Sequence, residues 1–286
     1  MNAFVQNQTR HYCSFLAECA VDALMDEVNL TPKPALVDRR GNGAHHDLTL
    51  ELMERSAQSL KPMFEAMALA ALEQGTVSQR LREAIGQIGR DGEAVMLTET
   101  QGVNTHRGAI WALGLLVTAT ALNSQKTRNI KASEICQIAA EIACLEDRFI
   151  PEQTESHGQF VQKKYGAGGA KLQAQQGFPV IMHFGLPQLR ASRAQYHPEV
   201  AARVDSLLAM MATLKDTCVL YRSGELGLKR MQKGAKYVLE LGGYATDTGK
   251  RALQFLEIDL MRLNASPGGV ADLLAATLFL DRVEQL

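Results

Sequence analysis

The stretch Gly102-Val103-Asn104-Thr105-His106-Arg107-Gly108 directly precedes an apolar run at 109–122. The run is hydrophobic on nearly every helical face, which predicts a central helix of a bundle. Asn104 or Thr105 can cap this helix, where free N–H groups and the positive end of the helix dipole favour an anion. A plain helix start with a surface histidine and arginine would fit the local pattern equally well. Under either interpretation, a polar segment begins the most apolar helix of the chain.

The composition indicates a globular chain with a large core. The chain has 286 residues, of which 46% are hydrophobic and 21% are charged, enough for one large domain or two small ones. A formal net charge of −1 argues against a general binder of nucleic acid or anionic membranes, so any anion site has to be a local cluster. Five cysteines without a Cys-x-x-Cys pair, no signal-peptide core and no membrane-spanning run together predict a cytoplasmic protein.

Helical periodicity recurs along the chain, and no period-2 alternation is long enough to build a sheet. Apolar residues three and four positions apart predict helices at 11–28, 48–60, 62–72, 78–98, 109–122, 131–148, 180–194, 198–214, 224–241, 248–263 and from 272 to the end. We therefore predict an all-α fold, a single domain over 1–286 of about ten helices, with its polar ligand loops gathered at one end.

The first of these polar loops lies at 31–47. Pro32 and Pro34 fix an extended entry, and Gly41 and Gly43 make a turn-like exit. Its ionisable residues are Lys33, Asp38, Arg39, Arg40, His45, His46 and Asp47. Seven such groups interleaved with apolar residues predict a half-buried ligand loop, since a solvated loop would explain only two of them.

A second unusual segment, at 151–179, is rich in glycine. It contains Ser156-His157-Gly158 and Tyr165-Gly166-Ala167-Gly168-Gly169-Ala170-Lys171. This density predicts a mobile lid or a loop that contacts a nucleotide, and the alternative is a plain interhelical linker. The segment lacks the third glycine of the dinucleotide pattern, Gly249-Lys250 does not complete a phosphate loop, and zinc spacings are absent from the sequence. Carboxylates acting with the phosphates of a nucleotide would suit Mg²⁺.

Four motifs together resemble one known family. They are Lys33-Pro34-x-Leu36-Val37-Asp38, Gly43-Ala44-His45-x-Asp47, the stretch 102–108, and Ser266-Pro267-Gly268-Gly269-x-Ala271-Asp272-Leu273-Leu274. The combination is similar to the triphosphoribosyl-dephospho-CoA synthase family over about 16–280. Residues 216–220 and 263–267 resemble the branch that serves malonate decarboxylase more than the branch that serves citrate lyase. The chain departs from the family pattern at Ala35, usually glycine, at Arg107, often lysine, and at 169–174, which lacks a glutamate.

The resemblance implies a glycosyl transfer in the biosynthesis of a prosthetic group. Such enzymes join C1 of the ATP ribose to the 2′-hydroxyl of 3′-dephospho-CoA, release adenine and keep the triphosphate. The product passes to a separate transferase that loads an acyl carrier protein, and a homodimer is compatible with the sequence. By analogy with glycoside chemistry, the transition state has oxocarbenium character, so the site needs a base, a proton donor and cations.

The resemblance also implies roles for residues. The catalytic candidates are His106, His45 and Asp272; the candidates for binding ATP and 3′-dephospho-CoA are Lys33, Arg39, Asn104, Thr105, Arg107, Arg222, Ser266, Gly268 and Gly269; and the candidates for Mg²⁺ are Asp38, Asp47 and Glu93. Which group is base and which is acid stays open. A non-catalytic nucleotide-binding accessory protein would lose these carboxylates, and a metal enzyme resembling ADP-ribosyl hydrolases would need paired aspartates. The retained acidic residues favour the transferase.

Overall fold

The computed structural model describes residues 3–125, 127, 130–150 and 157–285. Within these ranges the chain forms thirteen α-helices and one π-helical turn, and its extended pairing is confined to an isolated bridge between Asp38 and Gly41. The predicted all-α class is confirmed. More helices form than predicted, in part because the glycine-rich segment after residue 156 is not a continuous loop but contains two short helices.

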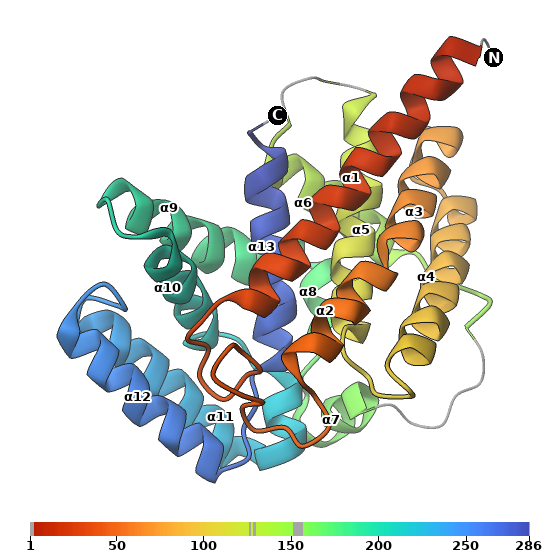
Figure 1. Cartoon of the computed structure of the whole chain (residues 1–286). Coiled ribbons are helices and arrows are strands. Elements are labelled where there is room, and N and C mark those ends of the chain that lie inside the picture. Colours follow the sequence, from red (N-terminus) through yellow and green to blue (C-terminus); the bar gives the residue numbers. More distant parts are fainter. Residues whose placement is uncertain (1–2, 126, 128–129, 151–156, 286) are drawn as a thin grey trace.

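The helices are α1 Ala3–Asn29, α2 Leu50–Ser59, α3 Lys61–Gln74, α4 Gln79–Glu99, α5 Arg107–Ser124, α6 Ala132–Cys144, α7 His157–Tyr165, α8 Gly169–Gln175, the π-helical turn η1 Ile181–Gly185, α9 Leu186–Ala194, α10 Glu199–Met211, α11 Thr217–Glu240, α12 Asp247–Arg262 and α13 Gly268–Val283. In Figure 1, α1 to α6 and α13 form the main bundle, and α9 to α12 lie to its left. A continuous apolar core includes residues from α1 through α13.

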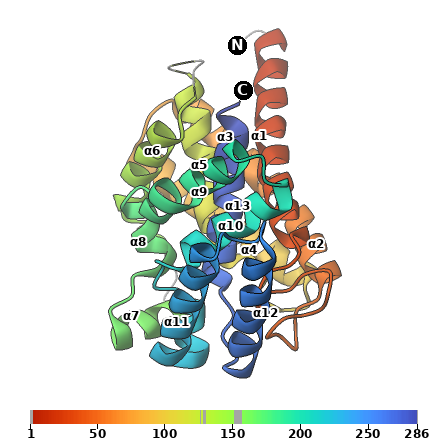
Figure 2. The ribbon, with the colours of Figure 1, turned by 90° about the vertical axis from the view of Figure 1, so that its left-hand side faces the viewer.

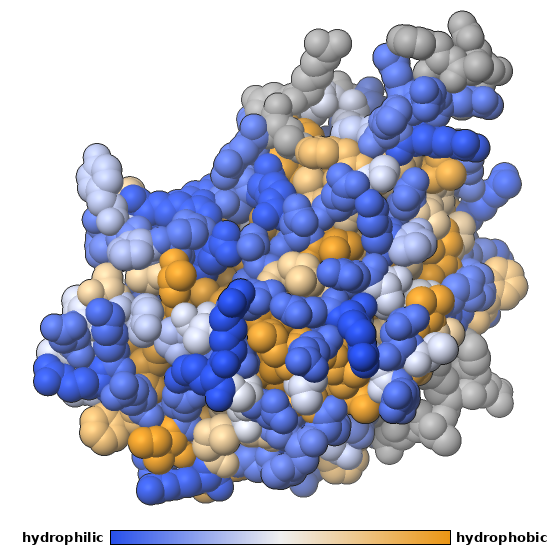
Figure 3. Space-filling view, in the orientation of Figure 1, coloured by the Kyte–Doolittle hydropathy of each residue, from blue (hydrophilic) through white to orange (hydrophobic). Residues whose placement is uncertain are grey.

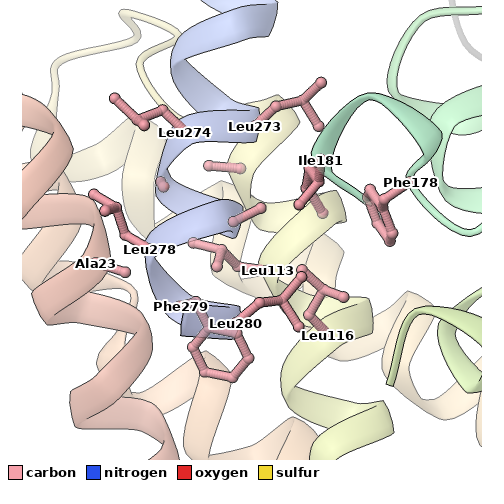
Figure 4. Packing of buried hydrophobic residues seen from close by; sticks show 14 of the residues in the cluster. Ala23, Leu113, Leu116, Phe178, Ile181, Leu273, Leu274, Leu278, Phe279 and Leu280 are labelled. Atoms are coloured by element: carbon pink, nitrogen blue, oxygen red, sulfur yellow. The ribbon is translucent and has the colours of Figure 1, made fainter. Parts of the chain in front are cut away.

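Helix α5 lies at the centre of the main bundle, as its all-round apolar sequence predicts. It packs against α3, α4, α6 and α13, and nearly all of its side chains are buried. Figure 4 shows Leu113 and Leu116 of α5 among apolar side chains of α13. The buried hydroxyls of Thr118 and Thr120 donate to the carbonyls of Gly114 and Leu116, so they leave no unpaired polar group in the core.

The central helices α5 and α13 begin at the same end of the bundle. Figures 1 and 2 place both starts at the lower end, beside the end of α1 and the loop at 30–49. Contacts between these segments agree, since His45 of the loop lies 2.7 Å from Ser266, directly before α13. The predicted gathering of polar loops at one end is therefore present.

Helices α11 and α12 form an antiparallel pair at the edge of the molecule, in the lower left of Figure 1. A surface groove of about 660 Å³ runs between them, and Phe255 on its wall is 71% exposed. Figure 3 shows apolar surface in this region among mostly hydrophilic atoms. Across the described ranges, no helix combines the length and apolarity that crossing a membrane requires.

Candidate active site

Five polar side chains from distant parts of the chain lie at the end of the bundle where α5 and α13 begin. They are Glu27 of α1, Lys33 of the proline loop, Ser56 of α2, His106 at the start of α5 and Asp272 of α13. Hydrogen bonds or electrostatic effects link them in pairs. The sequence predicted Lys33, His106 and Asp272 as site residues, and it did not single out Glu27 or Ser56.

His106 is a buried, neutral imidazole with one free nitrogen. The residue is 2% exposed, and its Nδ1 shares a hydrogen bond of 2.7 Å with Ser56 Oγ, which also lies 2.5 Å from Thr105 Oγ1. Burial, assisted by the nearby Lys33 cation, lowers the pKa of His106 to about 3. Its Nε2 has no hydrogen-bond partner among the described residues. A buried polar atom without a partner is costly in a protein interior, so this nitrogen is suited to a ligand.

The helix-start interpretation is correct only in part. His106 occupies the N-cap position of α5, but its side chain does not cap the helix. Instead, the Asn104 side-chain oxygen accepts the Arg107 N–H at 3.3 Å. The surface histidine that this interpretation required does not exist, because His106 is buried.

Asp272 lies directly over the start of α5. A Cβ atom on Gly108 would be 2.0 Å from Asp272 Oδ2, so only glycine allows this approach. The carboxyl group accepts a hydrogen bond from the Ala109 N–H, and the residue is partly buried. Burial, followed by the like charges of Glu27 and Asp216, raises the pKa of Asp272 well above its ordinary value. The surroundings of this carboxyl group therefore favour its protonated form.

Lys33 and Glu27 form a buried ion pair. The Lys33 ammonium donates to Glu27 Oε1 at 2.6 Å and to the Glu27 backbone carbonyl at 2.7 Å. Lys33 is 2% exposed and Glu27 is 3% exposed. A sequence signal for Glu27 existed, because it stands three and four residues after the buried Leu24 and Ala23, where helical spacing calls for an apolar residue.

His45, Ser266 and Arg222 connect the proline loop to the segment before α13. His45 Nε2 lies 2.7 Å from Ser266 Oγ, and burial followed by the Arg222 charge lowers the pKa of His45. Arg222 donates to the backbone carbonyls of Ala44 and Asn264. The sequence predicted these three residues as site residues, and the structure brings them together.

Asp216 joins the starts of α11 and α13, close to Gly268 and Gly269. Its carboxylate accepts the N–H groups of Cys218, Val219 and Val270 at 2.7, 3.1 and 2.9 Å, and so joins the starts of α11 and α13. A Cβ atom on Gly269 would lie 3.0 Å from Asp216 Oδ2, and one on Gly268 would lie 3.2 Å from Cys218 Sγ. Burial raises the pKa of Asp216 to about 6. A side chain at either glycine would be in tight contact with the start of α11.

The three predicted Mg²⁺ ligands do not come together. Asp38 is buried and accepts from Arg40 and from the Lys33 backbone N–H, and Asp47 lies 3.7 Å from His45 Nδ1. Glu93 pairs with Arg107, whose Nε lies 2.6 Å from Glu93 Oε1. The described part of the chain contains no group of three or more His, Cys, Asp or Glu side chains placed to hold a metal ion. The set Asp38, Asp47 and Glu93 therefore does not fit a single ion.

The remaining predicted cations are accessible. Arg39 is exposed and donates to Asn29 Oδ1 at 2.8 Å, and Arg107 is exposed beside Glu93. Short surface contacts of this kind contribute little to stability, so both guanidinium groups can change partners.

Part of the glycine-rich segment covers the start of α5. Trp111 Nε1 of α5 donates to the Ala170 carbonyl of α8 at 3.3 Å, and the His157 ring of α7 stacks on Tyr221 of α11 with ring centroids 3.8 Å apart. The expectation of a lid also included 151–156, which lie outside the described residues. From 157 onward, the segment contains two packed helices: α7 packs against α11, and α8 packs against α5 and α6.

Comparison with known proteins identifies the family. Residues 13–286 match the ATP:dephospho-CoA triphosphoribosyl transferase family. The chain is 59% identical to the probable 2-(5''-triphosphoribosyl)-3'-dephosphocoenzyme-A synthase of Pseudomonas fluorescens, over 99% of this chain and 97% of the relative. Proteins with the same description from Stutzerimonas stutzeri and Azotobacter vinelandii are 56% and 55% identical, over 99% and 100% of this chain and 96% and 97% of theirs.

No solved structure matches the chain. The extent of the family match, together with these identities, shows that the chain belongs to the ATP:dephospho-CoA triphosphoribosyl transferase family. It is an enzyme of the transferase class.

Proposed function

We propose that this enzyme makes 2'-(5''-triphosphoribosyl)-3'-dephospho-CoA from ATP and 3′-dephospho-CoA. The bond between C1 of the ATP ribose and the adenine nitrogen breaks, and a bond from C1 to the 2′-oxygen of dephospho-CoA forms. The hydroxyl group loses one proton and the departing adenine gains one, so protons balance. The observation that carries the proposal is a buried, neutral imidazole whose Nε2 has no partner among the described residues, at the same end of the bundle as a carboxyl group with a raised pKa.

The two groups have complementary protonation states. A neutral His106 can accept the proton of the attacking hydroxyl at Nε2, the nitrogen without a partner. A protonated Asp272 can donate to the departing adenine, because its environment opposes ionisation. Two titratable groups with pKa values pushed in opposite directions are a common arrangement for acid and base roles. We assign to His45, through its bond to Ser266, the orientation of the acceptor ribose.

Positive charge and helix starts suit the triphosphate. We assign its oxygens to the side chains of Lys33, Arg39, Arg107 and Arg222 and to the backbone around Asn104, Thr105, Gly268 and Gly269. The starts of α5 and α13 lie at the same end of the bundle, and the positive ends of their helix dipoles favour anions. Mg²⁺ would reach the site on phosphate oxygens, and because the predicted carboxylates do not form one set, we assign it no step.

We also propose that the product is the precursor of the prosthetic group on the acyl carrier subunit of malonate decarboxylase, through a separate transferase in the cytoplasm. The resemblance at 216–220 and 263–267 supports this branch over citrate lyase. Cells that lack this chain should contain malonate decarboxylase without its prosthetic group. If citrate lyase lost its group instead, the branch assignment would be wrong.

Adenine release is the direct test of the reaction. Purified protein with ATP, Mg²⁺ and 3′-dephospho-CoA should release one adenine for each product molecule, identified by chromatography and mass. Omitting dephospho-CoA should abolish coupled release. Release of pyrophosphate or phosphate in place of adenine would refute the proposed bond cleavage, and ATP binding without adenine release would favour the accessory protein.

A further inference from the structure

Glu27 is the carboxylate of α1 that faces the core. The side chains of Glu18, Asp22 and Asp26, on the same helix, reach solvent and pair with cations at the surface. Glu27 instead is 3% exposed, next to the apolar side chains of Leu24 and Val28. A charge at such a position requires a specific partner, because transferring it from water without one is strongly unfavourable.

The partner of Glu27 is Lys33, whose ammonium group keeps one N–H donor that Glu27 does not use. An ammonium group has three N–H donors, and two of them are directed to the Glu27 carboxylate and carbonyl at 2.6 and 2.7 Å. No third acceptor for Lys33 Nζ exists among the described residues. A buried ion pair is often replaceable by apolar residues without loss of stability, so stability alone does not account for this one.

The charges of the pair act on both groups to which we assign proton transfer. The Lys33 cation is close enough to act on His106, and the Glu27 carboxylate is close enough to act on Asp272. The other titratable groups that face Asp272 are Asp216 and Cys218, at the start of α11. The Ala109 N–H, at the start of α5, donates a hydrogen bond to Asp272.

We propose that Glu27 is a positioning residue of the transferase, which holds the Lys33 ammonium inside the cluster so that its remaining N–H meets a triphosphate oxygen of ATP. The inference rests on the proposed function and adds a residue that the motifs do not contain. Glu27 does not touch the substrate; it fixes the direction of the cation that does. A carboxylate in the last turn of α1 thereby couples the first helix to the site.

The test is Glu27→Gln, with Glu18→Gln as the matched control. Glu18 accepts from Lys61 at 2.7 Å on the exposed side of the same helix, so its variant removes an equal charge outside the site. We expect Glu27→Gln to weaken ATP binding by roughly 10- to 100-fold, the effect of losing one well-oriented charge-assisted hydrogen bond. Glu18→Gln should bind ATP like the parent protein. Calorimetry measures both.

A pH profile separates positioning from a merely structural role. Removing the Glu27 charge removes a like charge that raises the pKa of Asp272, so Asp272 should ionise at lower pH. The alkaline limb of the rate of adenine release should therefore shift to lower pH in Glu27→Gln and stay in place in Glu18→Gln. A folded Glu27→Gln protein with parental ATP affinity and an unmoved alkaline limb would overturn the inference.

The inference can still be tested if Glu27→Gln does not fold or if the proposed reaction is wrong. If Glu27→Gln does not fold, the double variant Glu27→Met with Lys33→Met replaces the pair by apolar side chains, and it should fold but bind ATP weakly. Parental affinity in that variant would overturn the inference. If the parent protein binds ATP without releasing adenine, the proposed reaction fails, while the calorimetric comparison still tests how Glu27 positions Lys33.

Discussion

Gly108 offers the sharpest test of the catalytic arrangement, because a single methyl group there would displace Asp272. In Gly108→Ala, the new Cβ atom would lie 2.0 Å from Asp272 Oδ2 and 3.0 Å from its Cγ. Ordinary van der Waals contact begins at 3.4 Å, so the carboxyl group has to move by more than 1 Å. Such a movement breaks its bond to the Ala109 N–H and shifts the proposed proton donor away from adenine. A displacement of this size costs about 100-fold in rate when a catalytic group must be aligned.

Stability should respond differently from rate. Alanine is favoured over glycine inside a helix by about 1 kcal/mol, which offsets part of the strain in the first turn of α5. We therefore expect Gly108→Ala to melt within a few degrees of the parent protein while adenine release falls by about 100-fold.

The matched control is Gly89→Ala in α4. The new Cβ there would meet the flexible end of Met67 at 3.3 Å and would lie against apolar atoms. This variant should keep both its melting temperature and its rate. Parental adenine release by a folded Gly108→Ala protein would refute the assignment of Asp272.

The remaining predictions concern His106 and Arg107. His106→Ala should stay folded and lose about 10²- to 10⁴-fold in adenine release, the usual contribution of a positioned acid–base group; near-parental turnover would remove His106 from the mechanism. Arg107→Ala should weaken ATP binding more than dephospho-CoA binding in calorimetry. Its melting temperature should change little, because the contact between Arg107 and Glu93 is at the surface. The control Glu93→Gln, which frees the same guanidinium group, should not weaken ATP binding. Stability should also depend on His106: because its folded pKa of about 3 is below its unfolded value near 6.5, the unfolded chain binds a proton first as the pH falls. This contribution is fully present above pH 6.5 and is lost progressively between pH 6.5 and pH 3, and the loss reaches about 2 kcal/mol at pH 5. In denaturant titrations, His106→Gln should therefore lose less stability than the parent between pH 7 and pH 5. Equal losses in the two proteins would contradict the depressed pKa.

The local pattern of the sequence determined the fold class and the central helix. Apolar residues at helical spacing, with no alternation of period two, are sufficient for an all-α chain because this periodicity follows from backbone geometry alone. The run at 109–122 is apolar on every face, so it could only be stable inside the bundle, and α5 lies there. The same local reasoning placed His106 directly before the apolar helix and Asp272 at the start of the last helix, which in the structure begins four residues earlier, at Gly268.

Tertiary structure decided what those residues face. Glu27 and Lys33 are near neighbours in sequence, yet their pairing depends on the turn after α1, and Ser56 reaches His106 from 50 residues away. The carboxylates Asp38, Asp47 and Glu93 seemed equivalent as Mg²⁺ ligands until packing gave each its own partner. Side-chain convergence depends on how helices far apart in sequence pack against one another, and no local periodicity encodes that arrangement. Hence the sequence named His106 as a candidate, and only the assembled bundle left its Nε2 buried and without a partner in the described part of the chain.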